Sequence, residues 1–392
     1  MAISLRLYQR EAVLGTRVQW RAGSIHTLIA LPVATGKTWI FCFMIHAIRA
    51  NGLRCLVLVN RDELVEQTVQ KLARIGIRPG IVKADRNEWS RDVVVASVQT
   101  LWSKRRLYII PPNRFSLVVV DECHYANSPG YQRVLQYFGE AYHLGCTATP
   151  FRGDHKSLAD AGWQSVAYVY PWHKAVEDGW LAPLRVERLQ TTTTLVGVSS
   201  KSDAMTGQTD FTASRLSSRI NTPTRNDAIV QAWIDRISPR RTLGFCATVE
   251  HTVSLANAFR RRGIEAHAIY GEMGPRERRV LIDGHKRGRF LVLINCQVLT
   301  HGYDDPGIQA IIMAKPTQSK VLYIQCVGRG LRPDRDHGKQ DCVLLDVVDI
   351  SDEHSMAINA EVAGLLGEFG QDRAIADGAV PELKGPESCE ET

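Results

Sequence analysis

Short runs of aliphatic residues alternate with amphipathic stretches along most of this 392-residue chain, and this alternation constrains its fold more than any other feature. Near-continuous aliphatic runs are typical of strands that are buried on both faces, as in a parallel sheet. The amphipathic stretches between them suit the helices that connect successive parallel strands. The pattern therefore predicts an α/β fold with strands at 27–31, 55–59, 93–96, 117–120 and 143–146, and then at 242–246, 266–270, 290–294, 310–313 and 342–347.

The chain length and the grouping of these strands predict two domains. A chain of 392 residues exceeds the usual size of one hydrophobic core. Residues 190–221, between the two groups of strands, are rich in Thr, Ser and Asp and show little periodicity, which is typical of a connecting segment. We therefore expect an N-terminal lobe at 1–185, a linker at 186–223 and a C-terminal lobe at 224–366.

Charge is distributed unevenly along the chain. The net charge is +7, but the residues from Glu368 onward include seven acidic and two basic ones, which gives −5 there and +12 for the rest. A basic body suits a polyanionic partner such as a nucleic acid. Residues 367–392 read as an acidic tail that we expect to be disordered. Such a tail could solubilise the chain, bind a protein partner or compete with nucleic acid for the basic body.

Composition disfavours several classes of protein. The sequence has no apolar run of the length that crosses a bilayer, and residues 1–8 lack the apolar core of a secretion signal. None of the nine cysteines forms a Cys-x-x-Cys pair, and most lie in apolar stretches. This is the pattern of reduced, buried thiols, and it disfavours a zinc site. We therefore expect a cytoplasmic protein.

A phosphate-binding loop is indicated where the first expected strand meets the first long amphipathic stretch. Gly36-Lys37-Thr38 follows the apolar run and opens a helix-like segment. Backbone amides and the helix dipole favour an anion at such a helix start. Lys37 would reach the β- and γ-phosphates, and the Thr38 hydroxyl would hold Mg²⁺. We therefore assign nucleotide binding to Leu31, Pro32, Val33, Ala34, Thr35, Gly36, Lys37 and Thr38.

The loop departs from the usual glycine pattern at two positions. Leu31 stands where the first glycine is usual, and Ala34 stands where a further glycine is often found. Alanine resists positive φ because its Cβ meets the backbone there. The sequence leaves two outcomes open at Ala34, namely a negative φ or a strained backbone.

A pair of carboxylates ends the expected strand at 117–120. Asp121 and Glu122 follow its apolar residues directly, so they should lie at the carboxyl end of a parallel strand, where α/β proteins bind ligands. Asp121 is suited to hold Mg²⁺ through water, and Glu122 is suited to orient and deprotonate the attacking water. With Lys37, these two residues form a predicted hydrolytic site.

With these motifs the chain resembles the DEAD/DEAH-like helicases of superfamily two, and Asp121-Glu122-Cys123-His124 is the matching box. The resemblance runs from Leu5 to Asp349, and the motifs occur in the family's order. It implies two tandem RecA-like lobes of the P-loop NTPase kind, with the ATP site in the cleft between them. It also implies ATP and Mg²⁺ as cofactors, and single-stranded or duplex DNA as the partner, with RNA left open.

The same resemblance implies roles for residues of both lobes. The segment Leu5–Gln9 looks like the family's Gln motif, in which Gln9 reads the adenine edge. The segment Thr147–Pro150 matches the motif that couples the ATP state to strand movement. The resemblance therefore assigns coupling to Thr147, Thr149 and His124, nucleic-acid contacts to Arg61, Gln99, Thr100, Thr248 and Thr300, and nucleotide contacts to Gly302 and Asp304.

The segment from Gln325 to Pro333 closely matches motif six, and its spacing also suggests catalysis. On a helix, Gln325, Arg329 and Arg332 would share one face. Arginine supplies planar donors that are always charged, which suit a phosphoryl-transfer transition state. We expect these three residues to complete the ATP site from the second lobe.

The sequence therefore predicts an ATP-dependent DNA helicase or translocase, acting in DNA replication, repair or recombination. The segment Ala148–Arg152 is similar to that of repair helicases and restriction motors, and compact versions occur in bacteria and phages. We accordingly expect the cytoplasm of a bacterial cell or of a phage-infected host. Two alternatives stay open: an RNA helicase, and a nucleotide-gated nucleic-acid-binding scaffold without efficient turnover, which Ala34 suggests.

Overall fold

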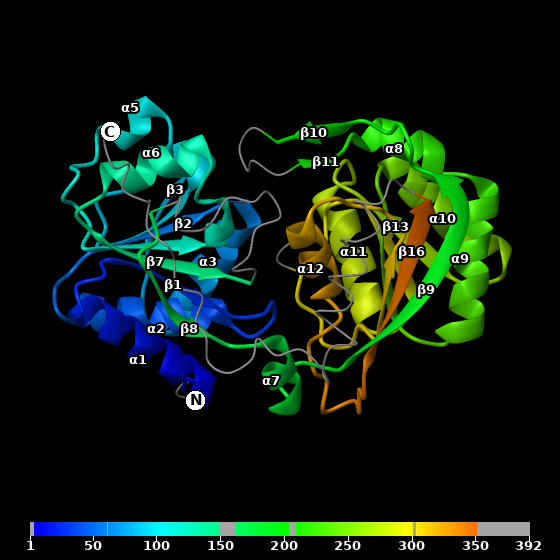
Figure 1. Ribbon diagram of the computed structural model, residues 1–392, viewed down its shortest axis with the longest axis horizontal. Helices are drawn as coiled ribbons and strands as arrows, with labels where there is room; N and C mark the ends of the chain where they lie inside the picture. Colours follow the sequence, from blue (N-terminus) through cyan, green and yellow to red (C-terminus); the bar gives the residue numbers. More distant parts are fainter. Residues whose placement is uncertain (1–3, 61, 149–161, 204–208, 301–302, 351–392) are drawn as a thin grey trace, which may run out of the picture. The chain divides into compact units, whose positions relative to one another are not determined.

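The structure is a computed structural model that describes residues 4–60, 62–148, 162–203, 209–300 and 303–350. The described chain forms two compact units (Figure 1). Residues up to Pro171 form the first unit, and residues from Trp172 form the second, except that Asp203 is grouped with the first. The predicted acidic tail at 367–392 lies outside the described residues.

The first unit is built on an eight-stranded sheet with the order β4-β3-β5-β2-β6-β7-β1-β8. All neighbouring strands pair in parallel except β3 and β4, which are antiparallel. Every residue of β2, β5 and β6 is buried, as expected of aliphatic strands covered on both faces. The strands are β1 (His26–Ala30), β2 (Cys55–Val59), β3 (Gly80–Lys83), β4 (Arg86–Asn87), β5 (Val93–Ser97), β6 (Leu117–Asp121), β7 (Tyr142–Thr147) and β8 (Ser165–Val169).

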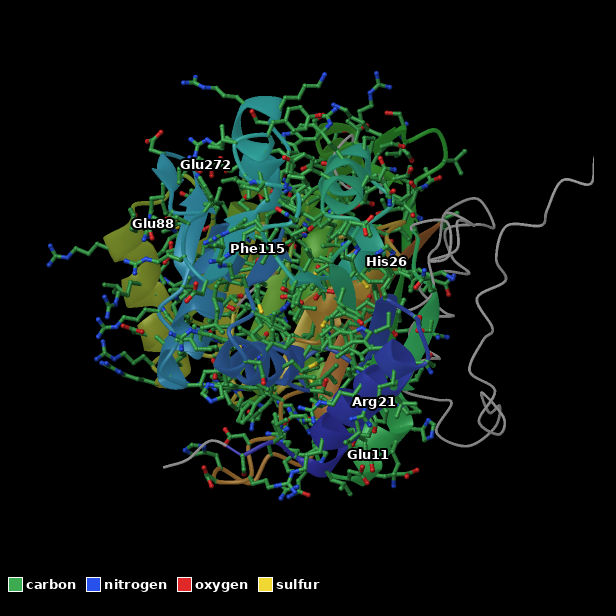
Figure 2. The ribbon with its side chains drawn as sticks, turned by 90° about the vertical axis from the view of Figure 1, so that its left-hand side faces the viewer. Glu11, Arg21, His26, Glu88, Phe115 and Glu272 are labelled. Carbon is green, nitrogen blue, oxygen red and sulfur yellow. The ribbon has the colours of Figure 1, made fainter. Side chains whose placement is uncertain are left out.

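Helices cover both sides of the first sheet, with α1 and α2 below it and α5 and α6 above it in the view of Figure 1. Figure 2 shows Glu11 and Arg21 along α1, and Phe115, which is buried and packs against the edge of Phe138. The helical segments are α1 (Leu7–Arg21), α2 (Lys37–Ala50), α3 (Asp62–Arg74), α4 (Val98–Leu101), α5 (Lys104–Leu107), α6 (Pro129–Tyr137) and the 3-10 turn η1 (Cys123–Tyr125).

The second unit contains a six-stranded sheet, parallel throughout, with the order β13-β14-β12-β15-β16-β9. Helices α9 and α10 lie on one side of this sheet and α12 on the other (Figure 1). The strands are β9 (Leu184–Thr194), β12 (Thr242–Phe245), β13 (Ala266–Ile269), β14 (Val292–Asn295), β15 (Ala310–Met313) and β16 (Cys342–Ile350). The helices are α7 (Trp172–Glu177), α8 (Ala213–Ile220), α9 (Pro223–Arg236), α10 (Val249–Arg261), α11 (Pro275–Lys286) and α12 (Lys320–Val327).

The α/β fold with two parallel-sheet units confirms the predicted fold class. Each of the ten expected strands corresponds to a strand of the structure. None of the helices within the described ranges has the length and apolar character that a membrane crossing requires.

The segment predicted as a linker, 186–223, differs from that expectation. Most of its described residues belong to the second unit, and β9 pairs in parallel with β16 as the outer strand of the sheet. Burial alternates along β9, and the polar Thr192 and Thr194 are exposed. A half-exposed edge strand lacks the continuous apolar run by which the other strands were predicted.

Further elements follow β9 in the same segment. A two-stranded antiparallel hairpin joins β10 (Ser200–Ser202) to β11 (Thr209–Phe211), and α8 comes next. Leu216 and Ile220 of α8 are buried with Leu195 and Ala247 in a small hydrophobic cluster. This cluster fixes α8 to the body of the second unit.

The carboxylate of Asp346, on β16, is buried in the second unit, with the Tyr323 hydroxyl and the Arg188 guanidinium near it. Burial raises the pKa of Asp346 to about 6, although the Tyr323 hydroxyl and the Arg188 guanidinium act in the opposite direction. A raised carboxyl pKa means that the fold favours the protonated acid. The associated stability is present below the ordinary pKa and is lost as the pH rises through 6.

Asp346→Asn should therefore stabilise the protein more at pH 8 than at pH 5.5. The neutral amide avoids the ionisation of a buried acid, and a pKa shift from 3.8 to about 6 corresponds to about 3 kcal/mol at the higher pH. Thermal unfolding of wild type and variant at both pH values measures the difference. Asp227→Asn, at a half-exposed site on α9, is the control and should show no such pH dependence. An equal stabilisation by Asp346→Asn at both pH values would contradict the raised pKa of Asp346.

Candidate nucleotide-hydrolysis site

The strand order of the first unit gathers the predicted hydrolytic residues at one edge of the sheet. Strands β6, β7 and β1 are neighbours and all parallel, so their carboxyl ends lie side by side. Asp121 ends β6, Thr147 ends β7 and Leu31 follows β1. The Leu31 amide donates to the Thr147 carbonyl at 3.0 Å, which joins two of these ends directly.

The predicted phosphate loop connects β1 to α2, as the sequence indicated. Gly36 is the N-cap of α2 and has φ +82°, a conformation that glycine adopts without strain. A Cβ at this position would lie 2.9 Å from Nε2 of Gln9, the end of a side chain that can shift, so the positive φ is the stronger reason for glycine here. The buried Lys37 ammonium donates to the carbonyls of Leu31 at 3.1 Å and Pro32 at 3.4 Å. Its charge is therefore held inside the loop that would surround a phosphate.

Ala34 adopts the strained alternative of the two that the sequence left open. Its φ is +68°, in the left-handed region. This conformation costs a non-glycine residue about 1–2 kcal/mol because Cβ crowds the backbone. Neighbouring hydrogen bonds maintain the loop: the Thr35 hydroxyl donates to the Pro32 carbonyl at 2.7 Å, and the Thr35 carbonyl accepts from Tyr8 at 2.6 Å.

Ala34→Gly should stabilise the first unit by about 1 kcal/mol. Glycine removes the left-handed strain of about 1–2 kcal/mol, and it loses part of that gain, about 0.4–1 kcal/mol, to the greater freedom of the unfolded chain. Urea unfolding measures the change. Ala47→Gly, inside helix α2, is the matched control and should instead destabilise by about 1 kcal/mol. A destabilised Ala34→Gly protein would show that the left-handed backbone is not strained.

Gln9 lies directly against the phosphate loop. Its Nε2 donates to the Thr35 carbonyl at 3.1 Å, and its Oε1 accepts from the Arg6 amide at 3.0 Å. The adjacent Tyr8 also bonds to the Thr35 carbonyl, and its ring stacks on Tyr170 with centroids 4.3 Å apart. Tyr8 lies within the Leu5–Gln9 motif, for which the resemblance assigns a role only to Gln9. Its position beside Gln9 at the start of a helix was the available signal.

The carboxylate pair follows β6 as predicted. Burial, together with the neighbouring Glu122 carboxylate, raises the pKa of Asp121, and the Lys37 ammonium partly offsets the shift. Glu122 has φ +55° and ψ +53°, a left-handed conformation that is costly for a residue with a Cβ. Its side chain is only 14% exposed. Strained backbone and a buried like-charge pair are arrangements that cluster at functional sites.

His124 links the carboxylate pair to the end of the next strand. Its Nδ1 lies 3.4 Å from Oε2 of Glu122 and 3.2 Å from Oγ1 of Thr147. All three side chains come from neighbouring carboxyl ends of the sheet. The two described residues that were predicted to act in coupling, Thr147 and His124, therefore contact each other, and His124 also contacts the predicted general base. Thr149, the third, lies outside the described residues.

In the second unit, the prediction that Gln325, Arg329 and Arg332 share one face of a helix is wrong. Helix α12 ends at Val327, so Arg329 and Arg332 follow it in a turn and a loop. A Cβ on Gly330 would lie 2.3 Å from Sγ of Cys342, which shows how closely the backbone approaches the sheet there. Pro333 also disfavours helical backbone at the residue before it. Spacing on a continuous helix therefore does not apply to these three residues.

The segment from Leu299 to Pro306 resembles the family's motif five, and its described residues nevertheless meet motif six within the second unit. The Arg329 guanidinium donates to the Tyr303 carbonyl at 2.7 Å. The Arg332 guanidinium forms an ion pair with Asp304, at a partly exposed position. Gln325 is buried, and its Oε1 has no hydrogen-bond partner among the described residues. Arg332 thus contacts Asp304, which was assigned to the nucleotide. Arg329 contacts Tyr303, the residue before Asp304.

The residues that were predicted to contact nucleic acid differ in their surroundings. Gln99 is exposed, but its Nε2 donates to the Asn60 carbonyl at 2.6 Å, and Thr100 accepts from the Ala84 amide at 3.2 Å. Thr248 is the N-cap of α10, and Thr300 is buried. Arg61 and Gly302 lie outside the described residues. These assignments stay predictions.

Two family models match the chain in tandem. The type III restriction enzyme res subunit model matches residues 2–152, and the helicase conserved C-terminal domain model matches residues 223–334. The chain is 35% identical over 378 residues to irc3 of Schizosaccharomyces pombe, described as a mitochondrial ATP-dependent helicase, covering 93% of this chain and 60% of that one. This chain belongs to helicase superfamily two. Its DEAD/DEAH-like box and its motif order are those of the superfamily.

Other superfamily-two relatives extend the comparison. Saccharomyces cerevisiae IRC3, described as an ATP-dependent helicase, is 30% identical, covering 97% of this chain and 56% of that one. The type I restriction enzyme EcoAI endonuclease subunit of Escherichia coli is 25% identical, covering 88% and 46%. This superfamily-two chain thus spans about half to three fifths of the length of these relatives.

Solved structures show the same fold. The type ISP restriction-modification enzyme LlaBIII bound to DNA matches with a TM-score of 0.70 at 14% identity, covering 93% of this chain and 30% of that one. Dbp5 of S. cerevisiae, bound to RNA and ADP BeF3, matches with a TM-score of 0.60 at 16% identity, covering 93% of each chain. At these identities the likeness supports the tandem RecA-like fold of superfamily two.

Proposed function

We propose that this chain is an ATP-driven motor that moves along DNA, unwinding it or translocating on it. The observation that carries the proposal is that Asp121 and Glu122 at the end of β6 lie near Lys37, which follows β1 through the phosphate loop; only β7 separates these two strands in the parallel part of the sheet. Family membership adds the second unit with its paired arginines. A role in replication, repair or recombination is the biological setting that fits such a motor.

ATP and Mg²⁺ would bind to the first unit. Lys37 would exchange its contacts with the loop carbonyls for phosphate oxygens, and Gln9 would recognise the adenine from its place beside Thr35. Asp121 suits a divalent cation, because a buried carboxylate with a raised pKa gains from a nearby positive charge. With the Thr38 hydroxyl it would hold Mg²⁺, which when bound would neutralise charge on the phosphates.

Glu122 would act as the general base. Its carboxylate is largely shielded from water and fixed by His124, so it can orient one water and take its proton. Because His124 also contacts Thr147, a change at the γ-phosphate would reach the end of β7. This chain of contacts supports a coupling role for Thr147 and His124.

Arg329 and Arg332 of the second unit would stabilise the charge that develops during phosphoryl transfer. Planar guanidinium groups suit this role. In the structure they bind the Tyr303 carbonyl and the Asp304 carboxylate, two acceptors that a transferring phosphate would replace. Loss of the γ-phosphate on hydrolysis would return the arginines to these residues, and that switch would drive the two units through a cycle.

DNA is the substrate that the comparisons favour over RNA. One relative is named as a type I restriction enzyme endonuclease subunit, and one structural neighbour is bound to DNA. The RNA-bound Dbp5 is also similar, and this observation keeps RNA as the second candidate. The basic body, with its charge of +12, suits either polymer.

A comparison of ATPase rates tests the proposal. The rate is measured without nucleic acid and with single-stranded DNA, duplex DNA or RNA, with Lys37→Ala as the inactive control. We expect stimulation by DNA in the wild type and none in the variant. If RNA alone stimulates the ATPase, the substrate is RNA rather than DNA. If no polymer stimulates it, the chain is not a nucleic-acid motor.

A further inference from the structure

One lysine outside every motif, Lys339, binds the loops that carry motifs five and six. It lies in the turn between the motif-six segment and β16. Its Nζ donates to the carbonyls of Gly330 at 2.5 Å, Arg332 at 2.8 Å and Pro306 at 3.1 Å. An ammonium group has three N–H donors, so these three acceptors satisfy it completely.

The three carbonyls belong to the backbone segments that hold the proposed phosphate-binding arginines. Gly330 and Arg332 lie in the loop after α12, and Pro306 directly follows the segment Tyr303–Asp305. Lys339 therefore fixes the distance between the two loops. Because it binds backbone rather than side chains, the Arg332 guanidinium is left to move while its main chain is held.

The other two connections between these loops depend on side chains that catalysis would redirect. Arg329 reaches the Tyr303 carbonyl, and Arg332 pairs with Asp304. If both guanidinium groups turn to phosphate, these contacts are lost. Of the three connections described, the one through Lys339 is independent of the nucleotide state.

The motif-five loop is also attached to the body of the second unit. The Arg241 guanidinium pairs with the Asp305 carboxylate at 2.8 Å and donates to the Gly307 carbonyl at 2.8 Å. Arg241 directly precedes strand β12. Through Pro306, Lys339 thus connects the motif-six loop to a segment that Arg241 already holds in place.

Desolvation makes the position of the charged Lys339 ammonium energetically unfavourable. Burial lowers the pKa of Lys339, although the neighbouring Cys342, Asp334 and Asp305 act in the opposite direction. Arg241, also nearby, lowers it further. Lys339 is partly buried, and a charged group in such a position is tolerated when its hydrogen bonds are satisfied. The three directed hydrogen bonds to carbonyls meet this requirement.

We propose that Lys339 is a positioning residue for phosphoryl transfer, which holds the backbone of the motif-five and motif-six loops so that Arg329 and Arg332 reach the transferring phosphate. This inference rests on the proposed ATPase function. It concerns kcat rather than nucleotide affinity, since Lys339 touches neither the phosphate loop nor a nucleotide-contacting side chain.

The test compares wild type with Lys339→Met, which keeps the length of the side chain and removes the donors. DNA-stimulated kcat and KM, the affinity for a fluorescent ADP analogue and the melting temperature are measured together. We expect kcat to fall by about tenfold to a hundredfold, because small displacements of catalytic groups have effects of this size. KM, ADP affinity and melting temperature should stay near wild type. Lys201→Met, at an exposed position on β10, is the control and should retain kcat.

An unchanged kcat in Lys339→Met would overturn the inference, as would a loss of kcat matched by an equal loss of ADP affinity or of folded protein. If Lys339→Met does not fold, Lys339→Arg decides. Its planar donors suit two carbonyls but cannot converge on three, so a folded protein with reduced kcat supports positioning and one with wild-type kcat refutes it. Absence of ATPase activity in the wild type would instead refute the proposed function itself.

Discussion

Replacing Glu122 with glutamine should lower kcat for ATP by about 10²–10⁴-fold while nucleotide binding persists. The amide keeps the size of the side chain but cannot take a proton from water. Glu122 is shielded and lies beside His124, so no bulk water replaces it easily as a base. The measurement is steady-state ATPase activity with DNA, combined with titration of a fluorescent ATP analogue.

Lys37→Ala provides the contrast to this variant. Lys37 is expected to bind the phosphates themselves, so its loss should weaken nucleotide binding as well as turnover. The two variants thereby separate binding from chemistry. A Glu122→Gln protein that hydrolyses ATP at nearly the wild-type rate would remove Glu122 as the base and would favour another proton acceptor.

Arg329→Ala should lower kcat for ATP by about 10³–10⁵-fold. Arginines that enter a phosphoryl-transfer site from a second element contribute about 10³–10⁵ in kcat. Binding of ATP to the first unit should persist, because the variant leaves the phosphate loop intact. Single-turnover hydrolysis with saturating enzyme isolates the chemical step.

Two controls accompany Arg329→Ala. Arg329→Lys keeps a positive charge without the planar donors and should recover little activity. Arg335→Ala removes an exposed arginine of the following turn, which donates to the Gly179 carbonyl at 3.0 Å, and should stay active. Thermal unfolding checks that loss of the bond to Tyr303 has not unfolded the unit. Normal turnover in Arg329→Ala would exclude it from the transition state.

The first unit could be predicted closely because its site is local in sequence. Asp121 ends a buried apolar run and Lys37 opens the helix that follows another, so the strand ends and the Gly36-Lys37-Thr38 motif placed both residues. The backbone at Ala34 could not be decided, because the strain of one residue depends on hydrogen bonds from Tyr8 and Thr35. Tyr8 belongs to α1, far from Ala34 in the sequence, so its bond to the loop could not be predicted from the loop residues alone.

The second unit was less predictable for physical reasons. The helix at motif six was expected to continue past Val327, but the approach of Gly330 to Cys342 depends on strand packing that spacing does not reveal. The edge strand β9 lacks a continuous apolar run. Lys339 has no motif at all, and its role depends on three carbonyl groups distant in sequence.

The most direct test of the central claim is displacement of a third DNA strand from a duplex. A labelled oligonucleotide bound as a triplex is released only when a protein moves along the duplex beneath it. We expect release by wild type with ATP, and none by Glu122→Gln or with a non-hydrolysable analogue. Rapid DNA-stimulated ATP hydrolysis that leaves the third strand in place, and that also fails to separate a partial duplex, would contradict a motor.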